Sequence, residues 1–252
     1  MKIALLGATG RLGAATLTQA LLDGHDVRAL VRRPEAVPQQ EGAEARSVRL
    51  DSVEALAEQL ADCDALVSAL GHGHGARARG NGDLMRRSVP VLAEAARRAG
   101  VRRVVHVAPF GAGETARLAS WRARSVYTTL ERARLADHAA ALAELDPHDL
   151  EWTTVMPVRL REGTPLHAFA VAPLAEVARV PGLPLLPYAN VAGVLVTLAT
   201  AVVHTPGPLL VTTAAGMRVR REAAHRFPPQ NDRAQNDRTQ NDRAQDDRAQ
   251  DD

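Results

Sequence analysis

Residues 2–13 read Lys-Ile-Ala-Leu-Leu-Gly-Ala-Thr-Gly-Arg-Leu-Gly, a short apolar run that leads directly into a glycine-rich turn. Apolar residues then recur at helical spacing as far as Leu22, and Gly24 follows as a stop signal. At a strand-to-helix turn, glycines allow close approach of a pyrophosphate, and the exposed N–H groups of the helix favour an anion. A glycine-rich turn without a ligand is the alternative. A strand, turn, helix and second strand within about 30 residues favour nucleotide binding.

Short apolar runs and longer segments of helical period alternate along most of the chain, which is typical of βαβ units and a parallel sheet. Continuous apolar runs such as 65–70 fit a sheet that is covered on both faces. We therefore expect an α/β fold, a Rossmann-type doubly wound parallel sheet flanked by helices. The predicted strands are 2–6, 26–31, 45–50, 65–70, 103–107, 151–156 and 209–212. The predicted helices are 11–22, 52–61, 84–99, 117–143 (whole or broken) and 191–203.

The end of the second predicted strand discriminates between cofactors. An acidic residue there accepts hydrogen bonds from the ribose of NAD, whereas an arginine accommodates the extra phosphate of NADP. Arg32 and Arg33 occupy this place and no carboxylate does, so NADP(H) is the predicted cofactor, with two solvated loop arginines as the alternative. Asp51 is expected to accept from the adenine amino group or to cap the helix that begins near Ser52. The predicted cofactor-binding residues are Gly7, Thr9, Gly10, Arg11, Leu12, Gly13, Arg32, Arg33, Asp51, Leu70, Gly71 and Pro157.

The composition divides the chain into a body and a tail. Of the 252 residues 46% are hydrophobic and 24% are charged, as in ordinary globular proteins. From Gln230 onward a five-residue Gln-Asn-Asp-Arg-Ala-like unit repeats without an apolar stripe. Residues 1–227 are therefore predicted to form a single NAD(P)-binding domain with the acceptor pocket, and residues 228–252 a low-complexity disordered tail. The tail carries seven Asp and four Arg, so the formal net charge of +2 leaves +5 on the body.

Several other classes of protein are disfavoured by the sequence. Cys63 is the only cysteine, which rules out an internal disulfide and fits a reducing, cytoplasmic location. Pro187 and Asn190 interrupt the apolar stretch 185–203, so we expect a buried helix there and no membrane span. The weak positive charge, without interleaved aromatics, argues against nucleic acid. We expect a monomer or a small homo-oligomer.

Seven segments carry a resemblance to a known family: 7–13, Arg32-Arg33, Asp51, 103–107, 111–114, Ala136-Asp137-His138 and 150–157. Together they resemble atypical short-chain dehydrogenase/reductases of the NmrA-like, NAD(P)H-binding type, and most closely the flavin reductase or biliverdin reductase B family. The nucleotide turn is specific to the superfamily, whereas the last two segments are moderately specific to the subfamily. The resemblance spans roughly residues 1–216 and implies hydride transfer from NADPH to a planar acceptor such as a flavin, a tetrapyrrole or a quinone-like molecule.

The chain departs from related enzymes in its candidate acid/base groups. The Tyr-x-x-x-Lys pattern is replaced by Tyr127 with Glu131, and Lys2 is the sole lysine, so Tyr–Lys carbonyl chemistry is disfavoured. The serine that relatives carry after the fifth strand is absent, and Arg159 stands where a histidine follows the Met-Pro pair. The resemblance leaves His138 as the catalytic candidate, donating a proton or a hydrogen bond, with a packing role as the alternative.

Two loops are expected to surround the acceptor. The stretch 71–82 is rich in Gly, His and Arg, and 157–187 is rich in Pro; both follow strand ends at the side where open α/β sheets bind ligands. The residues predicted to form the acceptor pocket are 71–82, 110–121 and 157–169. His72 and His74 lack carboxylate or Cys partners, so a flexible lid is favoured there and no metal site is predicted. Asn190 is expected to be a helix N-cap.

Three functions remain open. The first is an NADPH-dependent oxidoreductase, and the second is a non-catalytic NADP(H)-binding sensor or regulatory protein of NmrA type. A nucleotide-sugar or steroid-type dehydratase or epimerase is disfavoured because the Tyr–Lys pair is missing. The tail is either a tandem-repeat expansion or a partner-binding segment.

Overall fold

The computed structural model describes residues 1–72, 82–129, 131–145 and 149–220. The chain divides into a unit Met1–Arg218 and a unit Val219–Asp252, and only Val219 and Arg220 of the second are described. All described helices and strands lie in the first unit except β12 (Arg218–Val219), which crosses the boundary. The predicted tail and its boundary at residue 227 lie outside the described residues and stay a prediction.

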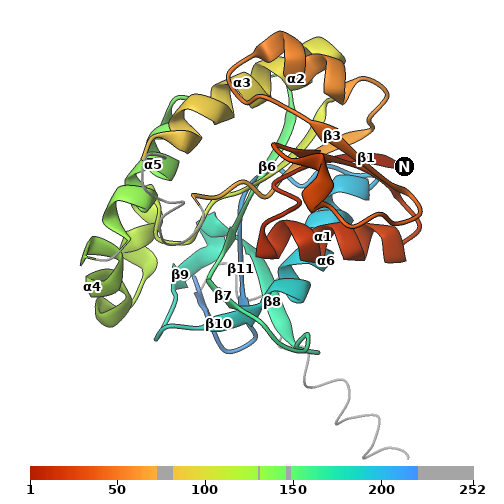
Figure 1. The fold of residues 1–252 in the computed structure, drawn as a ribbon. Helices are drawn as coiled ribbons and strands as arrows, with labels where there is room; N and C mark the ends of the chain where they lie inside the picture. Colours follow the sequence, from red (N-terminus) through yellow and green to blue (C-terminus); the bar gives the residue numbers. More distant parts are fainter. Residues whose placement is uncertain (73–81, 130, 146–148, 221–252) are drawn as a thin grey trace, which may run out of the picture. The chain divides into compact units, whose positions relative to one another are not determined.

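An eight-stranded sheet forms the centre of the first unit, in the order β3-β2-β1-β4-β5-β6-β11-β8 (Figure 1). Seven strands run parallel, and β8 pairs antiparallel with β11. The predicted doubly wound Rossmann-type sheet is thus confirmed. Its strand order reverses between β1 and β4, the point at which open α/β sheets bind ligands. The strands are β1 (Lys2–Leu6), β2 (Asp26–Val31), β3 (Ala43–Ser47), β4 (Ala65–Ser68), β5 (Arg103–Val107), β6 (Glu151–Pro157), β8 (Phe169–Pro173) and β11 (Gly207–Thr213).

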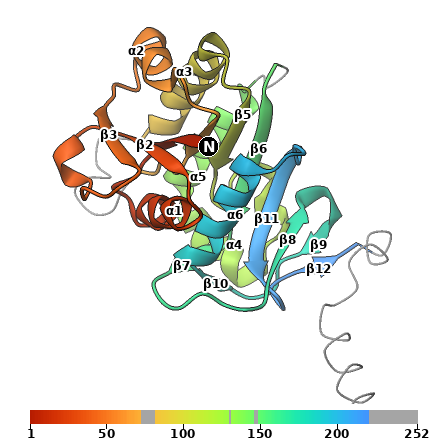
Figure 2. The same ribbon diagram turned by 90° about the vertical axis from the view of Figure 1, so that its right-hand side faces the viewer.

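Helices cover both faces of this sheet. Figure 2 shows α1 and α6 side by side on one face, with α2 and α3 on the other, where α5 packs against α3. The α-helices are α1 (Arg11–Leu22), α2 (Val53–Leu60), α3 (Leu84–Ala99), α4 (Trp121–Thr129), α5 (Arg132–Ala143) and α6 (Tyr188–Thr200). The 3₁₀ helices are η1 (Pro34–Ala36), η3 (Gly113–Leu118) and η4 (Leu174–Glu176). None of the helices in the described ranges has the length and hydropathy needed to cross a bilayer.

Strand β1 shows why the continuous apolar runs fit this architecture. Ile3 and Leu5 point into the core shared with α1 and α6, and Ala4 and Leu6 into the core shared with α2 and α3. All four side chains are at most 1% exposed. Because successive strand residues face opposite sides, only an unbroken apolar run can fill both cores.

Several boundaries differ from those predicted. The predicted helix 117–143 is divided among η3, α4 and α5, and β3 begins two residues earlier than expected and ends at Ser47. Asn190 is not a helix N-cap, because α6 begins at Tyr188 with Pro187 as its cap. The Asn190 amide instead accepts from the Leu166 N–H and donates to the Leu166 carbonyl, both at 2.8 Å. It therefore holds the segment that precedes β8 against α6.

The stretch 157–187, expected to be loop, contains four short strands. In addition to β8 these are β7 (Arg159–Arg161), β9 (Val177–Arg179) and β10 (Leu185–Pro187). β7 and β10 pair in parallel as a separate two-stranded sheet. Strands of three residues among prolines are too short to show a period of two in the sequence, and their pairing depends on tertiary contacts.

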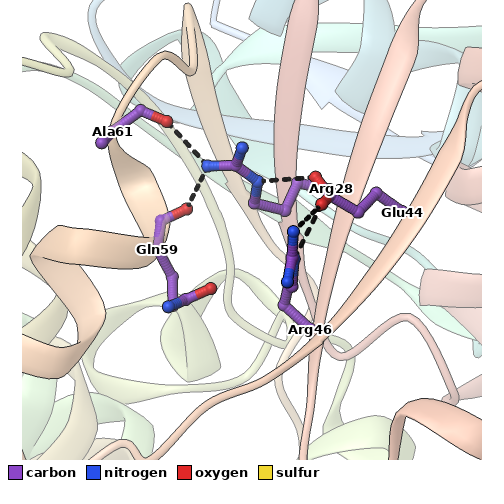
Figure 3. A network of polar contacts seen from close by, with 5 residues as sticks. All are labelled: Arg28, Glu44, Arg46, Gln59 and Ala61. Carbon is purple, nitrogen blue, oxygen red and sulfur yellow. Dashed lines mark hydrogen bonds and ion pairs between the residues drawn. The ribbon is translucent and has the colours of Figure 1, made fainter.

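A partly buried arginine joins β2 and β3 to the end of α2 (Figure 3). The Arg28 Nη1 donates to the carbonyl oxygens of Gln59 and Ala61 at 2.9 and 2.7 Å, and its Nε donates to Glu44 at 3.1 Å. Arg46 pairs with the other oxygen of the same carboxylate. A cation at a helix C-terminus also complements the helix dipole. The network fixes the edge of the sheet that leads to Arg32 and Asp51.

Candidate cofactor site

The glycine-rich turn is closely packed between β1 and α1. Gly7 adopts φ +83°, a left-handed conformation that favours glycine, and its carbonyl accepts from the Gly10 N–H at 2.8 Å. A Cβ placed on Gly13 would lie 2.0 Å from the Gly7 carbonyl oxygen and 2.9 Å from Cα of Ala8. Two of the glycines are therefore required by the turn and by the contact of helix with strand.

The N-terminus of α1 is left available to an anion. Gly10 is its N-cap and supplies no side-chain cap, and the first turn holds no acidic residue. The backbone N–H groups of Arg11, Leu12 and Gly13 are the first donors of the helix, where the helix dipole favours negative charge. Thr9, Gly10 and Arg11 are exposed, whereas the Leu12 side chain belongs to the core and leaves only its backbone for a ligand.

A hollow of about 490 Å³ adjoins this helix N-terminus. Thr9, Gly10 and Arg11 lie on one side, and Glu162 and Tyr188 are on the other. The Arg11 Nε lies 3.7 Å from the Glu162 carboxylate, in an exposed ion pair that contributes little to stability. The structure thus brings three of the predicted cofactor-binding residues to one concave surface.

The segment after β4 lies directly against the turn. A Cβ on Gly7 would be 2.6 Å from the carbonyl oxygen of Ala69 and 3.2 Å from the Leu70 nitrogen. The Ala69 N–H donates to the Leu6 carbonyl at 3.0 Å, which extends the β1–β4 pairing. Leu70 is half-buried and Gly71 is exposed at this edge. Pro157, also predicted to bind cofactor, is buried at the end of β6.

The end of β2 is cationic, as predicted. Arg32 and Arg33 are both exposed, and no ion pair involving either is found among the described residues. Asp51 does not cap α2, because the Ser52 hydroxyl accepts from the Ala55 N–H at 3.2 Å. Asp51 forms a bidentate ion pair with Arg49 instead, and the hydrogen bonds from Arg49 lower its pKa. The structure leaves its predicted contact with adenine untested.

Tyr127 lies in a different setting from a catalytic tyrosine of the Tyr–Lys type. Its ring is buried against Phe110, with ring centroids 6.3 Å apart, and burial raises the pKa of its hydroxyl, an effect that Arg159 partly offsets. Glu131 belongs to the next helix, as the N-cap of α5, and pairs with Arg134. A tyrosine that acts as a base needs a lowered pKa, which this burial opposes.

Three histidines form a buried cluster between the sheet and α5. The ring centroid of His138 lies 5.4 Å from that of His72 and 6.4 Å from that of His106, and each side chain is at most 6% exposed. His106 Nδ1 lies 3.2 Å from the Ser68 hydroxyl. One ring nitrogen of each histidine is buried without a hydrogen-bond partner in the described part of the chain.

This burial determines the protonation of two of the rings. It lowers the pKa of His138 to about 2, with further lowering by nearby His106, and lowers that of His106 to about 4. Both rings are neutral at pH 7. A neutral His138 can still donate a hydrogen bond, but it is a poor source of a proton. Its predicted catalytic role is untested.

Sequence reasoning missed the importance of Asp137. Its carboxylate accepts from the Met85 N–H at 2.7 Å and the Arg86 N–H at 3.1 Å, at the N-terminus of α3, and lies 2.7 Å from His72 Nε2. The available signal was a charged residue on the apolar face of α5, one turn before the buried Ala141.

His74 and most of the expected lid, residues 73–81, lie outside the described residues. Within the described ranges, no group of three or more metal-ligating side chains is placed to hold an ion.

Comparison with known proteins agrees with this geometry. The sequence model of the NAD(P)H-binding family matches residues 7–201, whereas no curated protein matches the chain. An oxidoreductase, YlbE, from Lactococcus lactis has 21% identity and a TM-score of 0.69, over 90% of this chain and 96% of that one. ChuY, an anaerobillin reductase from Escherichia coli O157:H7, has 20% identity and a TM-score of 0.67, over 84% of this chain and 97% of that one.

A third solved structure is a short-chain dehydrogenase/reductase from Veillonella parvula in complex with NADP. It has 14% identity and a TM-score of 0.70, over 86% of this chain and 96% of that one. At such identities these likenesses show a common fold. The family model, in contrast, covers most of the chain and includes the turn at Gly7, the switch point and α6. The chain therefore belongs to the NAD(P)H-binding family.

Proposed function

We propose that the protein is an NADPH-dependent oxidoreductase that transfers a hydride to a flavin, a tetrapyrrole or a quinone-like acceptor. The observation that carries the proposal is the uncapped N-terminus of α1 at the switch point of the sheet, with Arg32 and Arg33 exposed at the end of β2. Support also comes from solved relatives described as an anaerobillin reductase and as an NADP complex.

The residues present fit a dinucleotide phosphate. The backbone N–H groups of Arg11 and Leu12 would bind the pyrophosphate, and the close packing at Gly13 brings the helix N-terminus to the strand end. Arg32 and Arg33 would hold the extra phosphate of NADP through forked, charge-assisted hydrogen bonds. When bound, the nicotinamide supplies the hydride.

The protein's own contribution to the reaction is binding and orientation. Tyr127 has a raised pKa, and His106 and His138 are neutral, so none of these is poised to exchange a proton at pH 7. A reaction that depends mainly on holding two planar groups in contact needs no strong acid or base, because positioning alone removes much of the barrier. This favours a conjugated acceptor over an alcohol or a simple ketone.

The proposal is tested by mixing the full chain with NADPH and, in turn, FMN, riboflavin, biliverdin and a quinone, and following the absorbance of the reduced nicotinamide. NADH is the cofactor control. Arg32→Ala should raise the KM for NADPH roughly 10-fold or more and leave the KM for NADH unchanged, because only NADPH presents the extra phosphate. If NADPH is oxidised no faster with any acceptor than without one, the proposed activity is wrong.

A second candidate is an NADP(H)-binding sensor without turnover, favoured by the neutral, buried histidines and the missing Tyr–Lys pair. It predicts saturable binding of NADP(H) with no acceptor-dependent oxidation, and a partner protein that binds residues 1–227.

Cytoplasmic location and a monomeric or small homo-oligomeric state remain parts of both proposals. Truncation after Phe227 tests the tail: unchanged affinity and oligomeric state would exclude a role for it in either.

A further inference from the structure

Asp137 connects three parts of the structure that are far apart in the sequence. The Asp137 carboxylate is 5% exposed and projects from α5. One of its oxygens accepts from the Met85 N–H and lies 2.7 Å from His72 Nε2, and the other accepts from the Arg86 N–H. Because Met85 and Arg86 lie in the first turn of α3, the carboxylate caps that helix from another element and also complements its dipole.

The hydrogen bond to His72 has a defined direction. The carboxylate accepts from two backbone donors, so the third contact is satisfied when His72 Nε2 carries the proton and donates it. The opposite ring nitrogen, Nδ1, is buried without a partner among the described residues. His72 is therefore held through Nε2 alone, while the buried Nδ1 makes no hydrogen bond and so destabilises the fold. An unsatisfied buried polar atom calls for an explanation, and a positioning role for His72 provides one.

His72 leads directly to the nucleotide turn. Only Leu70 and Gly71 separate it from Ala69, whose N–H bonds to β1 and whose carbonyl lies against Gly7, with no space for a Cβ between them. A shift of His72 is thus transmitted through only two residues to the backbone that shapes the turn. His72 and Met85 also stand on either side of residues 73–81, so one carboxylate fixes the chain at both of these points.

We propose that Asp137 and His72 are positioning residues of the cofactor site, which hold the segment 69–72 against the turn at Gly7. This inference rests on the proposed binding of NADPH. It assigns the Asp-His segment of α5 a role different from the one expected from sequence. Asp137 acts through His72 and α3, while the neighbouring His138 packs against the His72 ring.

The variants His72→Ala and His72→Gln separate position from protonation. Alanine removes the donor, whereas the Gln Nε2 can take the place of the His72 Nε2 and donate to Asp137 without titrating. Both leave the bonds from Asp137 to Met85 and Arg86 intact, so α3 keeps its cap. His204→Ala is the control: its Nε2 also contacts a side-chain oxygen, the Thr153 hydroxyl at 3.2 Å, but it lies near the N-terminal end of β6.

Two measurements test the proposal: amide hydrogen exchange in the protein without cofactor, and the affinity of the protein for NADPH. In the apo protein, amide hydrogen exchange at Ala69 should be about 10-fold or more faster in His72→Ala, and close to wild type in His72→Gln and His204→Ala. The Kd for NADPH, from the fluorescence of the reduced nicotinamide, should rise about 10-fold in His72→Ala and stay within about 3-fold of wild type in the other two.

Each outcome decides the proposal. Wild-type exchange at Ala69 in His72→Ala, or failure of glutamine to restore it, would overturn the anchoring role. Should glutamine restore binding but abolish turnover, His72 moves a proton and is not a positioning residue. If the wild-type protein binds neither NADPH nor NADH, the proposed function fails, and exchange at Ala69 still decides whether the pair anchors the segment.

Discussion

Gly13→Ala and Gly193→Ala place the same methyl group in two helices with opposite expected effects. At Gly13 the new Cβ would be 2.0 Å from a backbone carbonyl oxygen, about 1.4 Å closer than an ordinary contact, and backbone cannot rotate away. Overpacking of this kind costs about 1–3 kcal/mol, and we expect the upper end, about 3. Alanine recovers about 1 kcal/mol of helix propensity, which leaves a net loss of about 2 kcal/mol in the free energy of unfolding. Gly193 has no atom within 4 Å of its Cβ position, so the control should gain up to about 1 kcal/mol.

Urea unfolding followed by the fluorescence of the buried Trp152 measures both changes, and titration with NADPH measures the site. Gly13→Ala moves α1 away from β1, and the misplaced N–H donors of the helix should weaken NADPH binding roughly 10-fold or more. Gly193→Ala should bind NADPH normally. A Gly13→Ala variant with wild-type stability and wild-type affinity would refute the argument that helix–strand contact requires glycine there.

Three further perturbations test other parts of the structure. Above pH 6.5 His106 and His138 are mostly neutral in both the folded and the unfolded chain. Below pH 6.5 both histidines bind protons in the unfolded chain, whereas burial keeps them neutral in the folded chain. The free energy of unfolding should therefore fall with a slope that approaches about 2.7 kcal/mol per pH unit as the pH drops from about 6 to about 5, above the pKa of most carboxylates, and His106→Asn should roughly halve that slope in urea unfolding. Arg28→Met removes the donor to two carbonyls at the end of α2 and leaves the Glu44 carboxylate with Arg46 alone, for an expected loss of about 2 kcal/mol by the same assay; an unchanged midpoint would exclude a structural role. Asn190→Asp cannot donate to the Leu166 carbonyl and should lower Tm by several degrees in a thermal melt, whereas equal melting would show that the bond is not needed.

The parallel part of the fold could be predicted because its signals are local. Strands 2–6, 26–31 and 103–107 and helices 11–22 and 84–99 have the predicted bounds, since each combines an apolar run or helical period with a clear stop. The region 157–187 could not be predicted in the same way. Its short strands exist because neighbouring strands offer them partners, β11 for the five-residue β8 and β7 for the three-residue β10, and nothing within such short segments encodes that pairing.

The cofactor turn was equally accessible from the sequence, because its glycines, the strand before it and the helix after it are contiguous. The contact between Asp137 and His72 could not be predicted from the sequence, because 65 positions separate the two residues. No local pattern around either residue indicates that it contacts the other. The burial of His138 between the sheet and α5 is likewise a property of tertiary packing that a match to a family motif does not reveal. Its predicted catalytic role stays a prediction.

The two edge strands of the main sheet, β3 and β8, determine whether the sheet could pair with a strand of another copy of the protein. At one edge, β3 is only five residues long and carries Glu44 and Arg46, charges that a pairing strand would have to desolvate. At the other, β8 runs against the direction of its neighbours and ends in Pro173, which has no N–H to offer. Within the described residues, both edges thus resist extension of the sheet from one molecule into the next, which protects the chain from edge-to-edge aggregation. Any assembly of copies is expected to use helix faces.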